Sequence, residues 1–253
     1  SYYAFLSIIL KILSCFDDIL ADGDDNAQRY RHLGAPHVTS ISNLKFIASP
    51  LPVNDQEIAP IAAALSSRPC WLYASTHADE EIIAARTHMA LKPKFPNLMT
   101  LMALRHPNRL DAVTQALSAL PLNIAYRSTA RVPAPDTDLY IIDTMGELGL
   151  FFKTVPITMM GRSFSLDGGG GHNPIEPALM GSYPLSGPHV QNLKTIYAAM
   201  TAGQAAEIVE TSNDLIARLD VLLSNRDQTR THGTRSQQFI MANQQALYQT
   251  VES

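Results

Sequence analysis

Apolar residues recur along this chain in two alternating patterns: short continuous runs, and longer segments in which they follow helical spacing. After residue 70, the short runs predict strands and the segments between them predict helices. This alternation is typical of an α/β fold with a doubly wound parallel sheet covered by helices on both faces. The predicted strands are 71–74, 98–103, 122–126, 139–142, 157–160, 183–185 and 206–209, and the predicted helices include 79–91, 110–119, 174–180, 190–200, 213–223 and 227–251.

The start of the chain shows a different pattern. Segment 2–20 has apolar residues at helical spacing and predicts an amphipathic helix, which we expect to be buried in a core. The alternative is a helix that lies on a membrane surface, although Lys11 is its only cation. A second helix is predicted at 26–33, ended by Gly34, and a strand at 37–42.

Segment 49–53, SPLPV, contains two prolines and is typical of a linker. We therefore expect residues 1–49 to be the end of an N-terminal domain and residues 50–253 to be a complete C-terminal domain. The last predicted helix could cross back to the first domain. Because the chain begins with Ser1 and has no charged leader, we expect it to start within a domain.

Composition and charge narrow the classes of function. The 253 residues are 46% hydrophobic and 17% charged, as in an ordinary globular protein, and no apolar run is long enough to span a bilayer. A net charge of −4 argues against a general nucleic-acid-binding role, because it leaves no surplus of cations for phosphates. Cys15 and Cys70 lack metal-ligand spacing, and we expect both to be buried free thiols in a reducing cytoplasm.

The most distinctive stretch is 168–178, GGGGHNPIEPA. Its glycines allow the main chain to approach a ligand closely, and Asn173 is a good N-cap for a helix that begins at Pro174. Glu176 falls at the third helical position and can complete a capping box. The N–H groups of a helix start suit a phosphate, and His172 and Glu176 could hold a phosphate and a ribose. A glycine loop and a capped helix without a ligand are the alternative.

Polar clusters follow four of the predicted strands at the point where each strand ends. The carboxyl ends of parallel strands share one edge of a sheet, and ligands bind at that edge, so we expect these clusters to form one site. Four clusters at one edge are difficult to explain by turn formation alone. They are STHADEE at 75–81, RHPNR at 105–109, DTMGE at 143–147 and GRSFSLDGGGGHNPIE at 161–176.

Several side chains near strand ends have both a functional and a structural interpretation. Arg105 can pair with a phosphate or carboxylate through its planar guanidinium, whereas Arg109 could equally form a surface salt bridge. Ser75 and Thr76 could cap a helix or contact a ligand. Lys45 follows an earlier predicted strand, where ligand groups are often placed, but a solvated lysine is the more common outcome.

The segment 143–147 is expected to start a helix capped by Asp143 and Thr144. Gly146 would allow a base or sugar to lie against the backbone, with Met145 as a polarisable wall. A plain helix start is the alternative interpretation.

Several common catalytic motifs are absent from the sequence. It has no nucleophile elbow, no phosphate-binding lysine loop, no zinc-protease helix and no cysteine-based metal spacing, and its glycine run lacks the dinucleotide-binding pattern. We therefore expect a nucleotide held by loops and helix ends, without a metal or cofactor. A transferase with an activated nucleotide donor fits such a site better than a hydrolase or a dehydrogenase.

Six motifs occur in a fixed order: STHADEE, RHPNR, DTMGELGLFF, GGGGHNPIEPA, SGPHVQN at 186–192 and NQQAL at 243–247. Together with the upstream stretches RYRHLGAPHV and SNLKF, they closely resemble the 3-deoxy-D-manno-octulosonic acid (Kdo) transferases. These enzymes use CMP-Kdo to add Kdo to a lipid A precursor (lipid IVA) in the inner core of lipopolysaccharide. The resemblance implies an inverting glycosyltransferase with two Rossmann domains (GT-B type), in which the C-terminal domain binds the donor and the N-terminal domain binds the acceptor.

The resemblance also implies partners, a location and site residues. The partners would be CMP-Kdo or CMP as donor substrate, a lipid A precursor, and the cytoplasmic face of the bacterial inner membrane, met through a preceding N-terminal part. Lys45 would stabilise the transition state. No residue matches the general-base glutamate of the family, so we expect this chain to bind donor without turnover. The CMP contacts would be Leu104, Arg105, Met145, Gly146, Glu147, Asn173, Pro174, Ile175 and Glu176.

The sequence departs from the family pattern at three points. Leu104 stands where proline is usual, the loop between Gly161 and Gly171 is longer than usual, and Asp167 replaces a residue that is often basic. Two alternative functions are a non-catalytic nucleotide-binding or membrane-associated module, and another nucleotide-sugar enzyme such as an epimerase. The missing base and the apolar first helix would favour the module.

Overall fold

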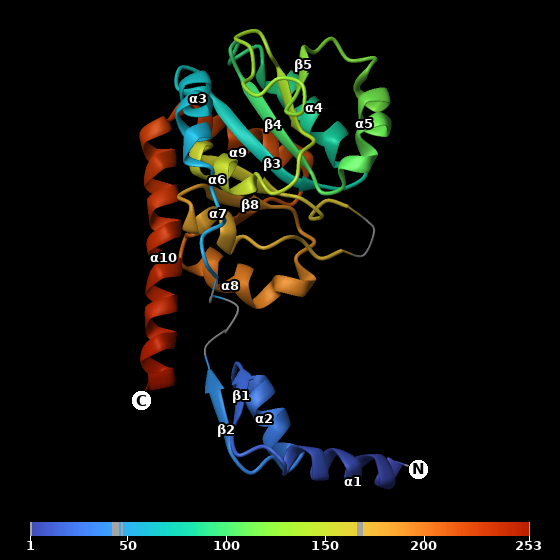
Figure 1. Ribbon diagram of the computed structural model, residues 1–253, viewed down its shortest axis with the longest axis vertical. Coiled ribbons are helices and arrows are strands. Elements are labelled where there is room, and N and C mark those ends of the chain that lie inside the picture. The colour runs from blue at the N-terminus through green and yellow to red at the C-terminus, as the bar shows by residue number, and fades with distance from the viewer. Residues whose placement is uncertain (1, 42–45, 47, 166–168, 253) are drawn as a thin grey trace. The chain divides into compact units, whose positions relative to one another are not determined.

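The computed structural model describes residues 2–41, 46, 48–165 and 169–252, which form two compact units (Figure 1). Unit 1 comprises Ser1–Ile47 and Ala242–Ser253, and unit 2 comprises Ala48–Met241. The division falls beside the proline-containing segment 49–53. The assignment of acceptor binding to the first unit and donor binding to the second stays a prediction.

Unit 1 contains a two-stranded parallel sheet. Its strands β1 (Ile19–Asp22) and β2 (Val38–Ile41) are connected by helix α2 (Asp24–His32), and helix α1 (Tyr2–Leu13) precedes them. Acidic residues in the first turn of α2 and basic residues in its last turn complement the helix dipole. The guanidinium of Arg31 donates to the carbonyl oxygen of Val38 at 2.7 Å, which ties the end of α2 to β2.

The predicted helix 2–20 is wrong beyond Leu13. The side chains of Ser14 and Cys15 hydrogen-bond back to the carbonyl oxygen of Lys11, at 2.9 and 3.1 Å, and close the last turn of α1. Residues 19–22 instead pair with β2, because strand pairing outweighs a weak local helix preference.

Burial in unit 1 also differs from expectation. Ile8, Leu10 and Ile12 on α1 are exposed, so the expectation of a core helix is wrong for these side chains. Cys15 is exposed as well, whereas Cys70 in unit 2 is buried as expected.

Unit 2 is built on a seven-stranded parallel sheet with the strand order β5-β6-β4-β3-β7-β8-β9. All seven predicted strands are present, with small shifts at their ends, so the predicted α/β class is confirmed. The strands are β3 (Cys70–Thr76), β4 (Met99–Leu104), β5 (Ile124–Tyr126), β6 (Leu139–Ile142), β7 (Ile157–Met160), β8 (Tyr183–Ser186) and β9 (Glu207–Ile208).

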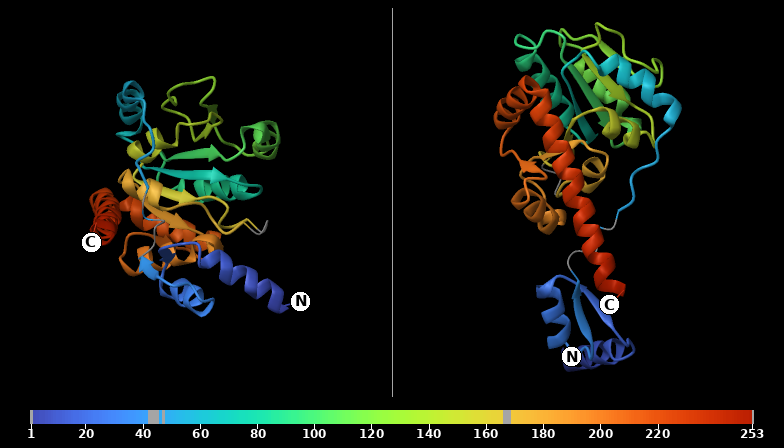
Figure 2. Two further views of the ribbon diagram at one scale, coloured as in Figure 1. Left: turned by 60° about the horizontal axis from the view of Figure 1, so that its bottom comes forward. Right: turned by 90° about the vertical axis from the view of Figure 1, so that its left-hand side faces the viewer.

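Helices cover both faces of this sheet (Figure 2), and no helix in the described part of the chain has the length and apolar character needed to cross a membrane. One helix that the sequence did not indicate, α3, is capped by the Asn54 side chain, which accepts the N–H of Gln56. The helices are α3 (Asp55–Leu65), α4 (Glu80–Leu91), α5 (Leu110–Leu117), α6 (Leu148–Thr154), α7 (Ile175–Leu179), α8 (Lys194–Ala202), α9 (Ser212–Ser224) and α10 (Arg226–Glu252), with short 3₁₀ helices η2 (Pro107–Arg109) and η3 (Gln191–Leu193).

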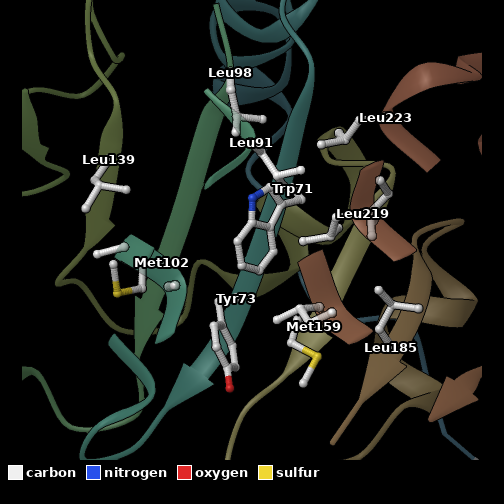
Figure 3. Packing of buried hydrophobic residues seen from close by; sticks show 14 of the residues in the cluster. Trp71, Tyr73, Leu91, Leu98, Met102, Leu139, Met159, Leu185, Leu219 and Leu223 are labelled. Carbon is white, nitrogen blue, oxygen red and sulfur yellow. The ribbon is translucent and has the colours of Figure 1, made fainter. Parts of the chain in front are cut away.

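The core of unit 2 consists of two hydrophobic clusters on opposite faces of the sheet. Along β3, Trp71 and Tyr73 point into the cluster covered by α4, α5 and α9 (Figure 3), and Cys70 and Leu72 belong to the cluster covered by α3 and α6. Because the central strands are buried on both faces, their sequences are continuous apolar runs rather than alternating ones. This rigid sheet fixes where the loops at its carboxyl edge begin.

Candidate functional site

The four predicted polar clusters follow four neighbouring strands of the sheet. Segments 143–147, 105–109 and 161–176 follow β6, β4 and β7, and segment 75–81 begins with the last two residues of β3. The topological switch lies between β3 and β7, because the chain builds the sheet outward in opposite directions from these two strands. Ligands of open parallel sheets bind at the carboxyl edge beside such a switch. The structure therefore brings the four clusters to the edge where a ligand is expected.

The backbone at this edge is strained. Ser75, Asp79 and Arg162 have φ angles of 59°, 73° and 57°, and they are three of the four non-glycine residues in the described chain with left-handed φ. Gly161 packs so closely on the end of β3 that a Cβ there would overlap the carbonyl oxygen of Ser75. Strained backbone persists only where surrounding contacts enforce it, and such enforcement is typical of functional sites.

Glu80, in the first turn of α4, joins the two sides of the topological switch. Its buried carboxylate accepts the main-chain N–H groups of His77, Arg162, Ser163 and Phe164, at distances of 2.8 to 3.1 Å. Burial raises the pKa of Glu80, and these four hydrogen bonds oppose that shift. The sequence analysis did not single out Glu80, because an acidic residue in the first turn of a helix is ordinary.

Glu81, the neighbour of Glu80, is also engaged internally. Arg109 donates to both of its carboxylate oxygens, at 2.9 and 3.2 Å, and the hydroxyl of Thr76 donates to it at 2.9 Å. The salt-bridge interpretation of Arg109 is therefore the one that the structure shows. Arg105 is exposed, and within the described residues its guanidinium has no ion-pair or hydrogen-bond partner. Of these two arginines, Arg105 is the one available to a ligand.

Segment 143–147 is a loop, and the prediction of a capped helix there is wrong. Helix α6 begins at Leu148 with Glu147 at its N-cap position. Asp143 instead accepts the N–H and the hydroxyl of Ser128, at 2.9 and 2.5 Å. Gly146 has φ of 80°, a left-handed conformation that cannot continue a helix.

Two residues of this loop are presented to solvent. Met145 is 65% exposed, and a Cβ built on Gly146 would meet no atom within 4 Å. The loop therefore offers an open backbone surface beside a flexible apolar side chain, which suits contact with a flat base.

Glu147 is held in place by a buried arginine. The Nε of Arg127 donates to both carboxylate oxygens of Glu147 at 3.1 Å, and the Thr144 hydroxyl donates to the same carboxylate. The hydrogen bond with Arg127 lowers the pKa of Glu147, and the same contact raises the pKa of Arg127. Glu147 is consequently a fixed anion at the edge of the loop.

The start of α7 differs in detail from the prediction. The N-cap position is Pro174, and no capping box forms with Glu176. Asn173 nevertheless accepts the N–H of Ile175 at 3.1 Å, from one position further out. Pro177 has no N–H, so Glu176 supplies the remaining main-chain donor of this short first turn. Burial raises the pKa of Glu176, and a hydrogen bond from Asn173 opposes that effect.

The described glycines of the glycine run pack against neighbouring side chains. A Cβ on Gly169 would overlap the Arg162 side chain, and one on Gly170 would crowd Asn192. The Nδ2 of Asn192 donates to the carbonyl oxygen of Gly169 at 2.6 Å. Close packing thus accounts for two glycines without a ligand.

Three histidines come together beside the topological switch. His77 follows β3, His106 follows β4, and His172 lies in the glycine-rich loop after β7. The Nε2 atoms of His77 and His172 are 3.2 Å apart, and the ring of His106 meets that of His77 edge-on with centroids 5.6 Å apart. Among the described residues, no group of three or more His, Cys, Asp or Glu could hold a metal ion.

The residues that the resemblance implies as ligand contacts differ in whether their side chains are accessible. Leu104, Pro174 and Ile175 are buried, so they can reach a ligand only through the main chain. Arg105, Glu147 and Glu176 lie in the segments that follow β4, β6 and β7 at the carboxyl edge of the sheet. Lys45, Asp167 and Gly168 lie outside the described residues. The individual ligand roles of all these residues stay predictions.

Comparisons with known proteins identify the relatives of this chain. The 3-deoxy-D-manno-octulosonic acid transferase of Rickettsia felis is 28% identical over 243 residues, which are 95% of this chain and 52% of that protein. The enzyme of the same name from Haemophilus influenzae is 30% identical over 241 residues, 92% of this chain and 55% of that protein. This chain is a relative of the Kdo transferases.

The resemblance inferred from the sequence is thereby confirmed, and the chain spans about half the length of these Kdo transferases. A probable Kdo transferase of Arabidopsis thaliana, described as mitochondrial, is 27% identical over 235 residues and is matched over 52% of its length. No protein-family model matches the chain.

Solved structures show the same fold as unit 2. The C-terminal CMP-Kdo binding domain of WaaA from Acinetobacter baumannii superposes with a TM-score of 0.67 at 24% identity, covering 74% of this chain and 99% of that domain. Sucrose-phosphate synthase from Thermosynechococcus elongatus gives a TM-score of 0.53 at 14% identity, covering 98% of this chain and 59% of that protein. These likenesses show that the α/β fold of this chain is shared with that domain and with that protein.

Proposed function

We propose that this chain is the donor-binding part of an inverting glycosyltransferase that moves Kdo from CMP-Kdo to a lipid A precursor, lipid IVA, at the cytoplasmic face of the inner membrane. The observation that carries the proposal is the arrangement of the carboxyl edge. Four loops with the motifs of the Kdo transferases follow four neighbouring strands beside the topological switch. Binding at this edge would bring a nucleotide into contact with all four.

The geometry suggests that each loop contacts a different part of the nucleotide sugar. The open backbone at Met145 and Gly146 suits the cytosine ring, and the exposed guanidinium of Arg105 suits the phosphate. The start of α7, with Asn173 and Glu176, would face the ribose or the sugar.

The chemistry of an inverting transfer explains why a cation is needed here. The acceptor hydroxyl loses a proton to a general base and attacks the anomeric carbon from the side opposite the phosphate. As the bond to CMP breaks, negative charge grows on the phosphate oxygens, and Arg105 would stabilise that charge, with Lys45 as a second cation. Because no residue matches the family's base, the proposal includes donor binding without turnover by this chain alone.

Calorimetric titration with CMP, UDP and GDP tests the donor. We expect CMP to bind at least about tenfold more tightly than either of the others, a difference of about 1.4 kcal/mol. Preference for UDP or GDP would indicate another nucleotide-sugar enzyme, and binding of none would contradict a donor site. Transfer of Kdo to lipid IVA by this chain alone would contradict the donor-binding-only part of the proposal.

Arg105→Gln tests the role of the cation. We expect a loss of about tenfold in CMP affinity, with cytidine affinity unchanged, because cytidine has no phosphate. Arg86→Gln is the matched control, since Arg86 is exposed on α4. Equal losses in the two variants would point to a general charge effect.

A further inference from the structure

Two histidines that are distant in the sequence meet at the topological switch. His77 is the first residue after β3, and His172 lies 95 residues further on, in the loop after β7. Their Nε2 atoms are 3.2 Å apart, and their ring centroids are 5.3 Å apart with planes tilted by 36°. This geometry is that of a direct hydrogen bond between two imidazoles.

A buried group anchors the backbone of each histidine. The Glu80 carboxylate accepts the main-chain N–H of His77 at 2.9 Å. The hydroxyl of the fully buried Tyr197 donates to the carbonyl oxygen of His172 at 3.0 Å. Both histidines remain partly accessible to solvent. The fold therefore holds the two imidazoles together while leaving them within reach of a ligand.

A contact between two Nε2 atoms requires one proton between them. One Nε2–H donates and the other Nε2 accepts with its lone pair, so at least one ring is neutral while the contact persists. Two imidazolium ions would oppose two N–H groups at this distance. The pair therefore carries at most one positive charge and titrates as one unit.

The surroundings of the pair favour an anion. Glu80 is satisfied by four main-chain N–H groups, and Glu81 is paired with Arg109. Arg105, on the loop after β4, has no ion-pair partner within the described residues. Among the described residues, the other titratable and charged side chains on the surrounding loops are Asp79, His106, Arg162, Glu176 and His189.

We propose that His77 and His172 form a proton-sharing couple that binds the anionic oxygens of the donor phosphate and takes up a proton when it does so. This inference rests on the proposed function. An anion beside the couple favours its singly protonated form, so binding of the phosphate shifts the couple toward that form. A sugar carboxylate has similar oxygens, and the experiments below separate it from the phosphate.

Calorimetry of CMP binding at pH 7.5, in two buffers with different ionisation enthalpies, measures the proton uptake. We expect His77→Gln and His172→Gln each to lower CMP affinity about tenfold and to abolish the uptake, while cytidine affinity is unchanged. The double variant should lose no more affinity than either single one, because residues that act as a unit are non-additive. Retained uptake in both single variants, or additive losses of about a hundredfold, would overturn the proposal.

Two further histidine variants serve as controls. His32→Gln, on the exposed face of α2 in unit 1, should leave both affinity and uptake unchanged. Uptake that is lost in His106→Gln but retained in His77→Gln would assign the proton to His106 and contradict the couple. Thermal unfolding of each variant verifies that the fold is kept.

Nuclear magnetic resonance of the imidazole nitrogens separates the couple from the proposed function. The ring of His77 should titrate differently in His172→Gln than in the unmodified chain, even if CMP does not bind. Independent titration of the two rings would overturn the couple, whereas a coupled titration without CMP binding would contradict only the proposed function. A response to free Kdo with none to CMP would overturn the phosphate as the ligand group.

Discussion

The carboxylate of Glu80 accepts the main-chain N–H of Ser163 at 3.0 Å, although 83 positions separate the two residues. This contact joins α4, which follows β3, to the loop after β7, and so crosses the topological switch. The candidate site thus rests on a buried acceptor whose four partners are all main-chain donors. The geometry of the loops should depend on it.

We expect Glu80→Gln to destabilise the protein by about 2 kcal/mol, because an amide would set an N–H₂ donor against buried N–H donors. Urea unfolding measures this loss. Glu210→Gln, at an exposed glutamate, is the matched control and should change little. Equal midpoints for the two variants would show that Glu80 does not hold the loops.

Arg127→Met should destabilise the protein by about 3 kcal/mol, because it leaves the carboxylate of Glu147 without its buried partner. The same change should weaken CMP binding if the loop 143–147 contacts the base. Arg131→Gln is the control, because Arg131 is largely exposed and its guanidinium pairs with Glu57 in the same cluster. Urea unfolding should show a much smaller loss of stability in Arg131→Gln than in Arg127→Met. Comparable losses in the two variants would contradict a special role for Arg127.

Two glycines at the site should respond differently to alanine. Gly161→Ala would force a Cβ onto the carbonyl oxygen of Ser75, a backbone atom that cannot move aside, and should prevent folding or cost more than about 3 kcal/mol. Gly146→Ala meets no atom, so only its left-handed φ of 80° is strained, at about 1 kcal/mol. Thermal unfolding of both variants measures the two losses of stability. A larger loss in Gly146→Ala than in Gly161→Ala would contradict the prediction.

His88 gives the protein a sensitivity to acid. Burial lowers its pKa to about 4, and its Nδ1 hydrogen-bonds with the Thr100 hydroxyl at 3.0 Å. The pKa of His88 in the folded protein lies below its ordinary value of 6.5, so below pH 6.5 the unfolded chain binds more protons than the folded protein does. The stability that neutral, buried His88 contributes at higher pH is therefore lost as the pH falls below 6.5. We expect the contribution of His88 to the free energy of unfolding to be about 2 kcal/mol smaller at pH 5 than at pH 7.5.

Urea unfolding at the two pH values tests the role of His88. The difference in free energy of unfolding between pH 7.5 and pH 5 should be about 2 kcal/mol smaller in His88→Gln than in the unmodified protein. It should be unchanged in His37→Gln, because His37 is exposed. An identical dependence in all three proteins would show that His88 does not titrate in this way.

The two cysteines should differ sharply in reactivity. Burial raises the pKa of Cys70 to about 12, so at pH 8 only about one thiol in ten thousand is ionised, whereas Cys15 is exposed. A disulfide reagent should modify one thiol rapidly in the folded protein and a second after unfolding in guanidinium. Cys15→Ser should remove the rapid phase. Rapid modification of both thiols would contradict the burial of Cys70.

The sequence by itself determined the local elements of unit 2 and the position of the polar motifs. Strands buried on both faces are continuous apolar runs, so β6 and β7 could be predicted to the residue. The polar motifs at the strand ends predicted that they would share one edge of the sheet. The order of these motifs resembles that of the Kdo transferases, and the relatives confirm this resemblance. Each of these signals is contained in a short window of residues.

Only the tertiary structure decided which side chains meet and which loops are regular. The segment 143–147 was expected to be helical, but Asp143 hydrogen-bonds to Ser128, Glu147 hydrogen-bonds to Arg127, and Gly146 adopts a left-handed φ of 80°. The Arg127–Glu147 pair follows from the pairing of β5 with β6, and the His77–His172 contact follows from the pairing of β3 with β7. These pairings are fixed by packing between residues far apart in the chain, and no local pattern of hydrophobic and polar positions encodes them.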